Sequence, residues 1–349
     1  MRIIVFEAEP WEQQVCSEFM GKQNIKFFPE LTIENASNYA NAEIISTFIY
    51  SRLNRRVLEQ FHHLKLIATR STGYDHIDTE YCQEKGIAVC NVPSYGEHTI
   101  AEHVFGLLLT HSRKIFASIE RTRQGDFSFK GLQGFDLRGK TLGVIGTGSI
   151  GQCVIEIAKG FRMEVIAFDV NPNRKLADRL GFEYAEMETV LKTADIVTLQ
   201  VPANPKTYHL IGQEELALMK DGAVLINAAR GNVVDILALF DVLQVGKISA
   251  CLDVLPQEII LRQEEELLHA VERQPDKAGT LLEILFANQL LLRLPNVIVT
   301  PHNAFNTREA RERILQTTAD NITGFLQGKL ENAIIGTNLN AREQEVGVR

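Results

Sequence analysis

The chain has 349 residues, of which 45% are apolar and 23% are charged, a composition typical of a globular protein with about two domains. Its formal net charge of −8 argues against nucleic acid or an anionic membrane surface as a partner. No apolar run approaches the ~20 residues of a membrane-spanning helix, and the start MRIIVFEAEP enters a strand-like run without the longer apolar region of a signal peptide. Five scattered cysteines, with no C-x-x-C pair, favour free thiols in a reducing cytosol over disulfides or a metal site. We therefore expect a cytoplasmic protein without a metal.

The first part of the chain alternates short β-rich runs with longer helix-like segments. Helices are expected at Glu12–Met20, Arg55–Phe61 and Asp78–Lys85. Apolar strands separated by helices are typical of a parallel sheet that is buried on both faces. The strands are expected at Ile3–Phe6, Ile25–Phe28, Glu43–Ile49, Leu64–Thr69 and Ile87–Asn91.

A long helix is predicted next, from about His98 to Arg123, and the Gly-rich segment Gln124–Gly139 after it is predicted to be a linker or surface loop. The alternation then restarts, a last helix is expected at Arg308–Gln327, and the polar tail from Asn338 is expected to fray. Repeated βαβ units predict an α/β fold of doubly wound parallel sheets. The further strands are expected at Leu142–Ile145, Glu164–Phe168, Ile196–Gln200, Ala223–Asn227, Ser249–Asp253 and Val297–Thr300.

A glycine-rich turn of the pattern G-x-G-x-x-G lies between a predicted strand and the predicted helix Gln152–Phe161. In this setting the pattern indicates a dinucleotide site. Gly146 would permit the tight turn, Gly148 would let a pyrophosphate approach the backbone, and Gly151 would allow close packing of helix and strand. The first N–H groups of the helix would then face the phosphates. The full segment is Gly146-Thr147-Gly148-Ser149-Ile150-Gly151.

Asp169 ends the next predicted strand, 18 residues after Gly151. A carboxylate at this distance can accept hydrogen bonds from both ribose hydroxyls and would repel a 2′-phosphate, which favours NAD over NADP. Arg174 and Lys175 lie shortly downstream and temper that preference. The simpler interpretation is an ordinary strand-to-helix turn with a solvated aspartate, but strand, glycines, helix and acid together favour NAD.

Three other predicted strands end near Arg230, Glu258 and His302. Ligands in such sheets bind beyond the carboxyl ends of the strands, so these side chains could converge. An arginine can clamp a carboxylate with two hydrogen bonds, and a histidine titrates near neutral pH and can act as acid or base. Each residue also has a simpler interpretation: a surface ion pair, a solvated loop acid and a structural histidine. Catalysis is therefore indicated by their combination.

In these motifs the chain resembles the D-isomer-specific 2-hydroxyacid dehydrogenases. The matching segments occur in that family's order and spacing, from near residue 40 to about residue 330. Tyr95 and Phe305 are most similar to the D-lactate dehydrogenase branch, where such residues line the pocket around a small substrate side chain. The segments are Arg70–Asp78, Gly146–Gly151, Asn227–Gly231, Asp253–Glu258 and Thr300–Phe305.

The resemblance implies a catalytic role for each of the three strand-end residues. Arg230 would bind the keto acid's carboxylate and polarise its carbonyl. His302 would be the general acid in reduction and the base in oxidation, and Glu258 would fix its tautomer. NADH would supply the hydride. The implied binding residues are Thr72, Gly73, Tyr95 and Phe305 for the substrate, and the glycine-rich turn, Asp169, Val201, Pro202, Ala228 and Asp253 for the cofactor, with Asp253 near the nicotinamide amide.

The resemblance also implies a discontinuous architecture. Residues 1–97 and 305–349 would form a flavodoxin-like substrate domain, and residues 98–304 would form a Rossmann domain that binds NAD. Catalysis would lie in a cleft between them, closing to exclude water. A homodimer built on the cofactor domains is the family expectation.

Three segments depart from the family pattern. Gly96-Glu97-His98 replaces a Ser-Pro-Asn-like stretch, and Gln200 stands where a histidine is frequent. The connection at residues 259–294 is longer than in most relatives and holds the acidic run Glu264–Glu266 and the apolar run Leu281–Phe286. It is expected to form one or two extra helices packed on the cofactor domain; a lid or subunit contact is the alternative.

These features together predict reversible hydride transfer between NADH and a small 2-keto acid, with pyruvate and D-lactate favoured. Glyoxylate, hydroxypyruvate and branched keto acids are the alternatives within the same enzyme class. A different class, an NAD(H)-sensing regulatory protein of dehydrogenase-like fold, would bind the cofactor without turnover. Such proteins usually carry long disordered extensions, which this sequence lacks.

Overall fold

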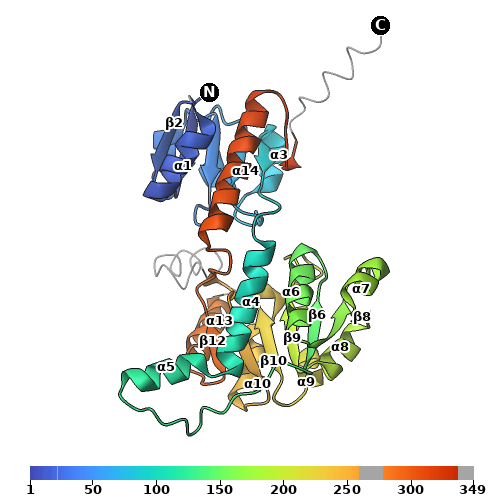
Figure 1. Cartoon of the computed structure of the whole chain (residues 1–349). Coiled ribbons are helices and arrows are strands. Elements are labelled where there is room, and N and C mark those ends of the chain that lie inside the picture. The colour runs from blue at the N-terminus through green and yellow to red at the C-terminus, as the bar shows by residue number, and fades with distance from the viewer. Residues whose placement is uncertain (22, 259–277, 337–349) are drawn as a thin grey trace. The chain divides into compact units, whose positions relative to one another are not determined.

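The computed structural model describes residues 1–21, 23–258 and 278–336. The chain divides into two compact units (Figure 1). Unit 1 comprises Met1–Tyr95 and Thr307–Arg349, and unit 2 comprises Gly96–Asn306. The expected fraying of the tail from Asn338 concerns residues that lie outside the described part of the chain.

Unit 1 is built on a sheet with the strand order β13-β5-β4-β3-β1-β2. The five strands that the sequence predicts all pair in parallel, in the order of a flavodoxin-like fold. The sixth strand, β13, pairs antiparallel to β5 at the edge and is missed by the sequence analysis, because three residues show too little periodicity. The bounds are β1 Ile3–Phe6, β2 Ile25–Phe28, β3 Ile44–Thr47, β4 Leu66–Thr69, β5 Ala88–Cys90 and β13 Ala333–Ile335.

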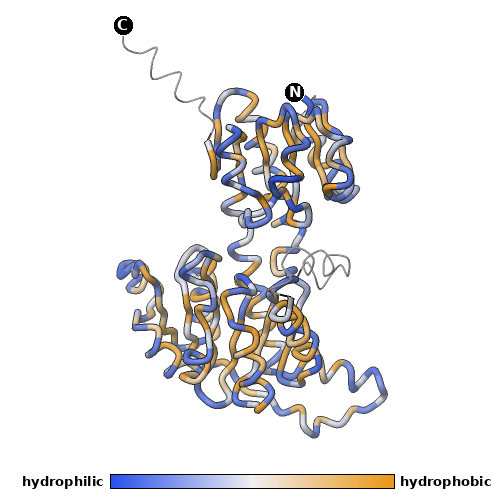
Figure 2. The backbone as a smooth tube through the Cα atoms, turned by 180° about the vertical axis from the view of Figure 1, so that it is seen from behind, coloured by the Kyte–Doolittle hydropathy of each residue, from blue (hydrophilic) through white to orange (hydrophobic). Residues whose placement is uncertain are grey.

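Helices cover both faces of this sheet. Alternate residues of β1 illustrate this: Ile3 joins the core cluster that includes Ala319 and Phe325 of α14, whereas Ile4 joins the one that includes Leu58 of α2. Burial on both faces explains why all four residues of β1 are apolar and buried; Figure 2 colours the chain by hydropathy. The helical elements are α1 Pro10–Met20, η1 Ala36–Tyr39, α2 Arg55–Leu58, α3 Thr79–Lys85 and α14 Arg308–Leu326.

Unit 2 is a Rossmann fold. Its sheet has the order β12-β11-β10-β9-β6-β7-β8, and every pairing is parallel. The central strand β6 lies where the direction of winding reverses, which is where such sheets bind dinucleotides. The bounds are β6 Thr141–Ile145, β7 Glu164–Phe168, β8 Glu183–Tyr184, β9 Ile196–Leu199, β10 Val224–Asn227, β11 Ser249–Leu252 and β12 Val297–Val299.

The predicted single helix from His98 to Arg123 is wrong. The chain forms α4 (Glu97–Ser112) and α5 (Ile115–Arg123), separated by Lys114 in the left-handed region at φ +53°. The carbonyl of Ser112 accepts a hydrogen bond from Phe135 N at 2.9 Å, so a tertiary contact ends the first helix. No proline or glycine marks this break in the sequence.

The other helices of unit 2 flank the sheet (Figure 1). Helix α4 packs against α6, with Val104 and Leu108 fully buried in the core. Within the described residues, no helix has the length and apolar character needed to cross a bilayer. The remaining bounds are α6 Ser149–Gly160, α7 Arg174–Leu180, α8 Met187–Thr193, α9 Gln213–Leu218, η2 Gly231–Val233, α10 Ile236–Gln244 and α13 Ala278–Leu291.

The long connection at residues 259–294 is described from residue 278 onward, so the acidic run Glu264–Glu266 lies outside the described residues. Helix α13 packs against α10, and Leu291 is fully buried in the core of unit 2. The buried Asn288 donates from Nδ2 to the carbonyl of Pro256 at 2.9 Å. This part of the connection is therefore a packed helix that supports the backbone just before Glu258.

Candidate active site

The glycine-rich turn joins β6 to α6, and the three glycines meet different surroundings. Gly146 has a φ of +95°, and a Cβ there would lie 2.5 Å from the carbonyl oxygen of Gln200. A Cβ on Gly151 would lie 2.2 Å from the carbonyl oxygen of Gly146, whereas nothing lies within 4 Å of one on Gly148. Two glycines are therefore required by neighbouring backbone, and the third leaves the turn open to a ligand. A pyrophosphate fits this arrangement, because Gly148 caps α6 and the next N–H groups, of Ser149 and Ile150, open the helix.

Asp169 directly follows β7 and faces this turn. Its Oδ2 accepts hydrogen bonds from the backbone N–H of Thr147 at 2.7 Å and from the Thr147 hydroxyl at 2.9 Å. Burial alone would raise the pKa of this carboxyl, but the hydrogen bonds from Thr147 and from the N–H of Asn171 outweigh it and hold the pKa below its ordinary value. Asp169 is therefore ionised at neutral pH. Tyr184, which the sequence analysis missed, contacts the Thr147 hydroxyl at 2.8 Å.

Val201 lies beside the same turn, and Ala228 follows a strand of the sheet. The Val201 side chain would lie 3.0 Å from a Cβ on Gly146, so the segment after β9, which continues to Pro202, borders the glycine-rich turn. Ala228 follows β10 and is almost fully buried in the core of unit 2. Val201 therefore fits a residue that shapes a nucleotide site by packing, whereas Ala228 belongs to the core of unit 2.

Arg230, Glu258 and His302 follow the three adjacent strands β10, β11 and β12. All three strands are parallel, so the residues lie at the same edge of the sheet. The structure thus brings together at one edge the residues that the sequence places up to 72 positions apart, since 302 − 230 = 72.

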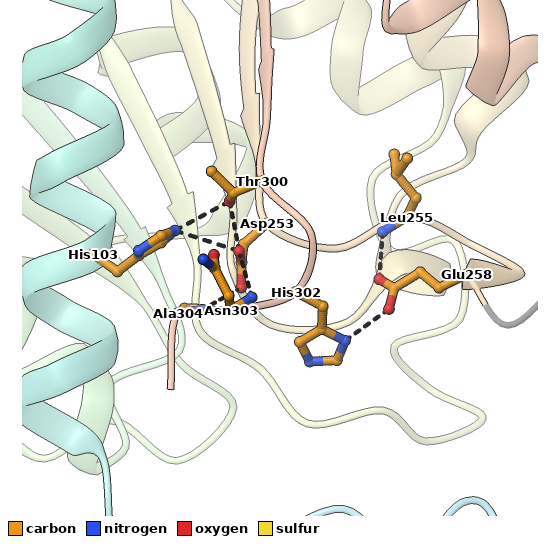
Figure 3. A network of polar contacts seen from close by, with 8 residues as sticks. All are labelled: His103, Asp253, Leu255, Glu258, Thr300, His302, Asn303 and Ala304. Atoms are coloured by element: carbon orange, nitrogen blue, oxygen red, sulfur yellow. Dashed lines mark hydrogen bonds and ion pairs between the residues drawn. The ribbon is translucent and has the colours of Figure 1, made fainter. Parts of the chain in front are cut away.

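His302 and Glu258 are in direct contact (Figure 3). His302 Nδ1 lies 2.7 Å from Glu258 Oε2. A carboxylate oxygen can only accept a hydrogen bond, so Nδ1 is the donor. Glu258 is held in turn, because its Oε1 accepts the backbone N–H of Leu255 at 2.7 Å. The imidazole is thereby fixed in one tautomer, with Nε2 left for a second partner.

Arg230 caps the short helix η2, and its loop contacts the loop that carries Glu258. Asn227 holds the turn by donating to the carbonyl of Arg230 at 2.9 Å. A Cβ on Gly231 would lie 2.2 Å from the carbonyl carbon of Leu255, so the two loops touch through their backbones. This contact explains the glycine after Arg230 and was not foreseen from the sequence.

Asp253 lies at the same edge but is 1% exposed, and its carboxylate accepts several hydrogen bonds from within unit 2. Oδ1 accepts from the Thr300 hydroxyl at 2.5 Å and from Asn303 N at 3.0 Å, and Oδ2 accepts from Ala304 N at 2.9 Å. The family resemblance implies a place for Asp253 near the nicotinamide amide, and in the structure its carboxylate also holds the loop that carries His302.

The proposed substrate residues outside this edge lie in loops that follow strands. In unit 1, Thr72 donates from its hydroxyl to the carbonyl of Val92 at 2.7 Å, and Ser71 donates to the carbonyl of Gly73 at 2.6 Å. The carbonyl of Tyr95 accepts from Arg313 Nε at 2.5 Å. In unit 2, Phe305 is half-buried at the end of the His302 loop.

Comparisons with known proteins agree with this geometry. Residues 105–304 match the NAD-binding domain of the D-isomer specific 2-hydroxyacid dehydrogenases. The chain is 33% identical over 339 residues to the D-lactate dehydrogenase of Escherichia coli (strain K12), covering 94% of this chain and 98% of that one. It is 36% identical over 340 residues to an aromatic 2-oxoacid reductase of Clostridium sporogenes (strain ATCC 15579), covering 95% and 98%. The structure of Aquifex aeolicus D-lactate dehydrogenase complexed with NAD and lactic acid matches with a TM-score of 0.82 at 33% identity, over 96% of this chain and 99% of that one.

Proposed function

Because this chain belongs to the D-isomer specific 2-hydroxyacid dehydrogenase family, we propose that it reduces pyruvate to D-lactate with NADH and catalyses the reverse reaction. It is an NAD-dependent oxidoreductase. The observation that carries the proposal is the contact of 2.7 Å between His302 Nδ1 and Glu258 Oε2 at the sheet edge where Arg230 also lies. This contact supplies an oriented acid–base group beside a carboxylate-binding group.

His302 is the proton donor in this mechanism. With Nδ1 donating to Glu258, the ring presents Nε2 to the substrate, and protonated Nε2 delivers its proton to the carbonyl oxygen during reduction. In oxidation the neutral Nε2 accepts the proton of the hydroxyl group. Glu258 carries no proton to the substrate; it holds the ring in the productive orientation.

Arg230 binds and polarises the substrate. A guanidinium can donate two parallel hydrogen bonds to a carboxylate, which fixes the keto acid in one orientation. We further propose that the backbone N–H groups of Thr72 and Gly73 contact the carboxylate and that Tyr95 and Phe305 contact the substrate's side chain. The hydride comes from the nicotinamide ring of NADH.

The cofactor is held by the glycine-rich turn and Asp169. Gly148 and the first N–H groups of α6 would hold the phosphates, and the Asp169 carboxylate would accept hydrogen bonds from the ribose hydroxyls. Its negative charge disfavours a 2′-phosphate and supports NAD over NADP. We propose that Val201, Pro202 and Ala228 line the nucleotide site and that Asp253 acts beside the nicotinamide.

Pyruvate is favoured because relatives named as D-lactate dehydrogenases cover nearly the whole chain. The aromatic 2-oxoacid reductase relative makes larger 2-keto acids the main alternative, followed by glyoxylate, hydroxypyruvate and branched keto acids. Relatives can share the same catalytic residues and still prefer different substrates, because preference depends on the residues that contact the substrate's side chain.

We also propose a homodimer in the cytoplasm. Helix α5 has no buried residue, and together with the following loop it extends from the rest of unit 2 (Figure 1). Phe116, Phe127 and Phe129 on this segment are 62%, 84% and 88% exposed. Aromatic side chains gathered on an exposed segment favour a subunit contact. Light scattering should give a dimer for the wild type and a monomer for Phe127→Ser/Phe129→Ser; a wild-type monomer would contradict the assignment.

The cytoplasmic location is supported by five cysteines that are free and buried.

The test of the proposed function is NADH and NADPH oxidation across a panel of 2-keto acids, with the chirality of the product determined. We expect pyruvate with NADH to give the highest kcat/KM and the product to be the D isomer. His302→Ala should lower kcat by ~10²–10⁴, the typical contribution of positioned acid–base catalysis. A loss of less than about tenfold would exclude His302 as the acid. Binding of NADH without turnover of any acid would favour a regulatory protein instead.

A further inference from the structure

A second histidine, His103, lies close to the catalytic loop, and the proposed mechanism does not use it. It stands on α4, and its Nε2 lies 3.1 Å from the Thr300 hydroxyl oxygen and 3.3 Å from Asp253 Oδ1. The Thr300 hydroxyl donates its only hydrogen to Asp253, so it accepts from His103 Nε2. Figure 3 shows this cluster on one side of His302 and the Glu258 contact on the other.

The cluster controls the backbone that carries His302. The backbone N–H of His302 donates to the carbonyl of Asp253 at 2.8 Å. The N–H groups of the next two residues, Asn303 and Ala304, both donate to the Asp253 carboxylate. Successive N–H groups that converge on one anion form a nest, an arrangement that binds an anion.

His302 needs this support because its own conformation is unfavourable. Its φ is +53°, in the left-handed region that residues other than glycine rarely adopt. Such a conformation is strained and persists only where its surroundings over-determine it. The hydrogen bonds to Asp253 supply that constraint, and the position of the imidazole depends on them.

Asp253 is itself held from one direction by helix α4. The carboxylate is buried, with 1% of its side chain exposed, so its place depends on neighbouring donors rather than on water. His103 and Thr300 are the side-chain donors around Oδ1, and His103 is the one that reaches it from a separate helix. Helix α4 is packed on α6 through Val104 and Leu108, which makes it a rigid base.

We infer that His103 is a positioning residue for His302, acting through Thr300 and Asp253 on the loop that carries the catalytic imidazole. The inference rests on the proposed function in that His302 must be the acid–base group. Removing the His103 donor loosens Asp253, relaxes the nest and misaligns His302 from both Glu258 and the substrate. A misplacement of about 1 Å can cost about 10²-fold in rate.

The test compares His103→Leu, which removes the donor and keeps the volume, with His103→Gln, whose amide nitrogen can replace Nε2. We expect His103→Leu to lower kcat for pyruvate reduction about ten- to hundredfold. His103→Gln should restore most of the loss. His63→Leu, the same change at an exposed histidine of unit 1, is the control and should leave kcat unchanged.

A proton NMR measurement separates positioning from general stability and needs no turnover. The proton on His302 Nδ1, which is hydrogen-bonded to Glu258, should give a downfield imidazole resonance that is absent in His302→Asn. We expect His103→Leu to shift or broaden this resonance and His103→Gln to retain it. The pair Thr300→Val and Thr300→Ser tests the same link if His103→Leu fails to fold: valine should reproduce the defect and serine should not.

An unchanged kcat and resonance in His103→Leu would overturn the inference. So would losses in His103→Leu and Thr300→Val that neither conservative variant restores. If the wild type reduces no 2-keto acid, the proposed function fails, and the resonance still decides whether His103 positions the His302 ring.

Discussion

The carboxylate of Glu258 joins two parts of the catalytic edge, because Oε2 lies 2.7 Å from His302 Nδ1 while Oε1 accepts the N–H of Leu255 at the same distance. Both oxygens are engaged, so the glutamate has no freedom to rotate away from the imidazole. Leu255 belongs to the segment against which Gly231 packs. The imidazole of His302 and the loop that carries Arg230 are therefore both fixed by one short stretch of backbone.

Glu258→Gln should lower kcat/KM for pyruvate about ten- to hundredfold, a smaller loss than the ~10²–10⁴ expected on removing the acid itself. An amide matches the shape but offers one acceptor oxygen, so either the His302 or the Leu255 hydrogen bond is lost. Steady-state kinetics and NADH fluorescence titration check this, with the Kd for NADH expected to stay within about twofold. Glu283→Gln, at an exposed position of α13, is the control and should behave as wild type. Full activity in Glu258→Gln would remove the orienting role.

Asp169→Ser should raise the ratio of kcat/KM for NADPH to that for NADH by about tenfold or more, equivalent to about 1.4 kcal/mol. The physical reason is the loss of a negative charge where a 2′-phosphate would lie. The hydrogen bond between the carboxylate and the Thr147 hydroxyl is lost as well, so Thr147→Val is the matched control: it removes that contact and keeps the charge. The ratio should move in Asp169→Ser alone. An equal change in both variants would assign the effect to the shape of the turn.

Gly151→Ala should weaken NADH binding and lower the free energy of unfolding by about 1–3 kcal/mol. The added Cβ would lie 2.2 Å from the carbonyl oxygen of Gly146, which is backbone and has little room to move. Gly160→Ala is the control on the same helix, because nothing lies within 4 Å of a Cβ there. Alanine favours helix over glycine by up to about 1 kcal/mol, so this variant should be as stable as wild type or slightly more so. Denaturant unfolding and NADH titration of both variants decide the point.

Local patterns made much of the fold predictable from the sequence. The glycine-rich turn and Asp169 are set by neighbouring residues in the sequence. The apolar strands β1 to β7 are set by burial of whole strands. Each of these features has a pattern that can be recognised. The break between α4 and α5 has no such pattern, because it depends on Phe135, 23 residues after Ser112 (135 − 112 = 23). The short edge strands β8 and β13 have too few residues to show a period.

The candidate site was predictable in part for the same reason. Arg230, Glu258 and His302 stand shortly after the ends of predicted strands, and parallel topology brings strand ends together. Their supports were not predictable, since a lone histidine on an apolar helix, such as His103, is more often structural than functional. Its meaning comes from Asp253 and Thr300, which lie 150 and 197 residues away along the chain (253 − 103 = 150; 300 − 103 = 197). The family resemblance implies roles for Arg230, Glu258 and His302, and the structure shows which side chains and backbone groups contact the loops that carry them.

The lowered pKa of the Asp253 carboxyl makes the free energy of unfolding of the wild type vary with pH in the acid range. Burial alone would raise this pKa, but hydrogen bonds from His103, Thr300, Ala304 and Asn303 outweigh it and hold the pKa below its ordinary value. The folded state therefore favours the ionised form. The resulting stability is complete above the unfolded pKa of ~3.9 and is lost as the pH falls through the lower folded pKa.

Asp253→Asn should therefore destabilise the protein by about 1–3 kcal/mol at pH 7, because an amide nitrogen would face donors in a buried site. Below about pH 4 the wild type loses the advantage of its carboxylate, so the difference between the two proteins should shrink. Urea unfolding of both proteins from pH 7 to pH 3 measures this. Asp241→Asn, at an exposed position of α10, should differ from wild type by a small amount that does not change with pH. A difference for Asp253→Asn that stays constant across the range would show that hydrogen-bond geometry, and not the charge of Asp253, stabilises the His302 loop.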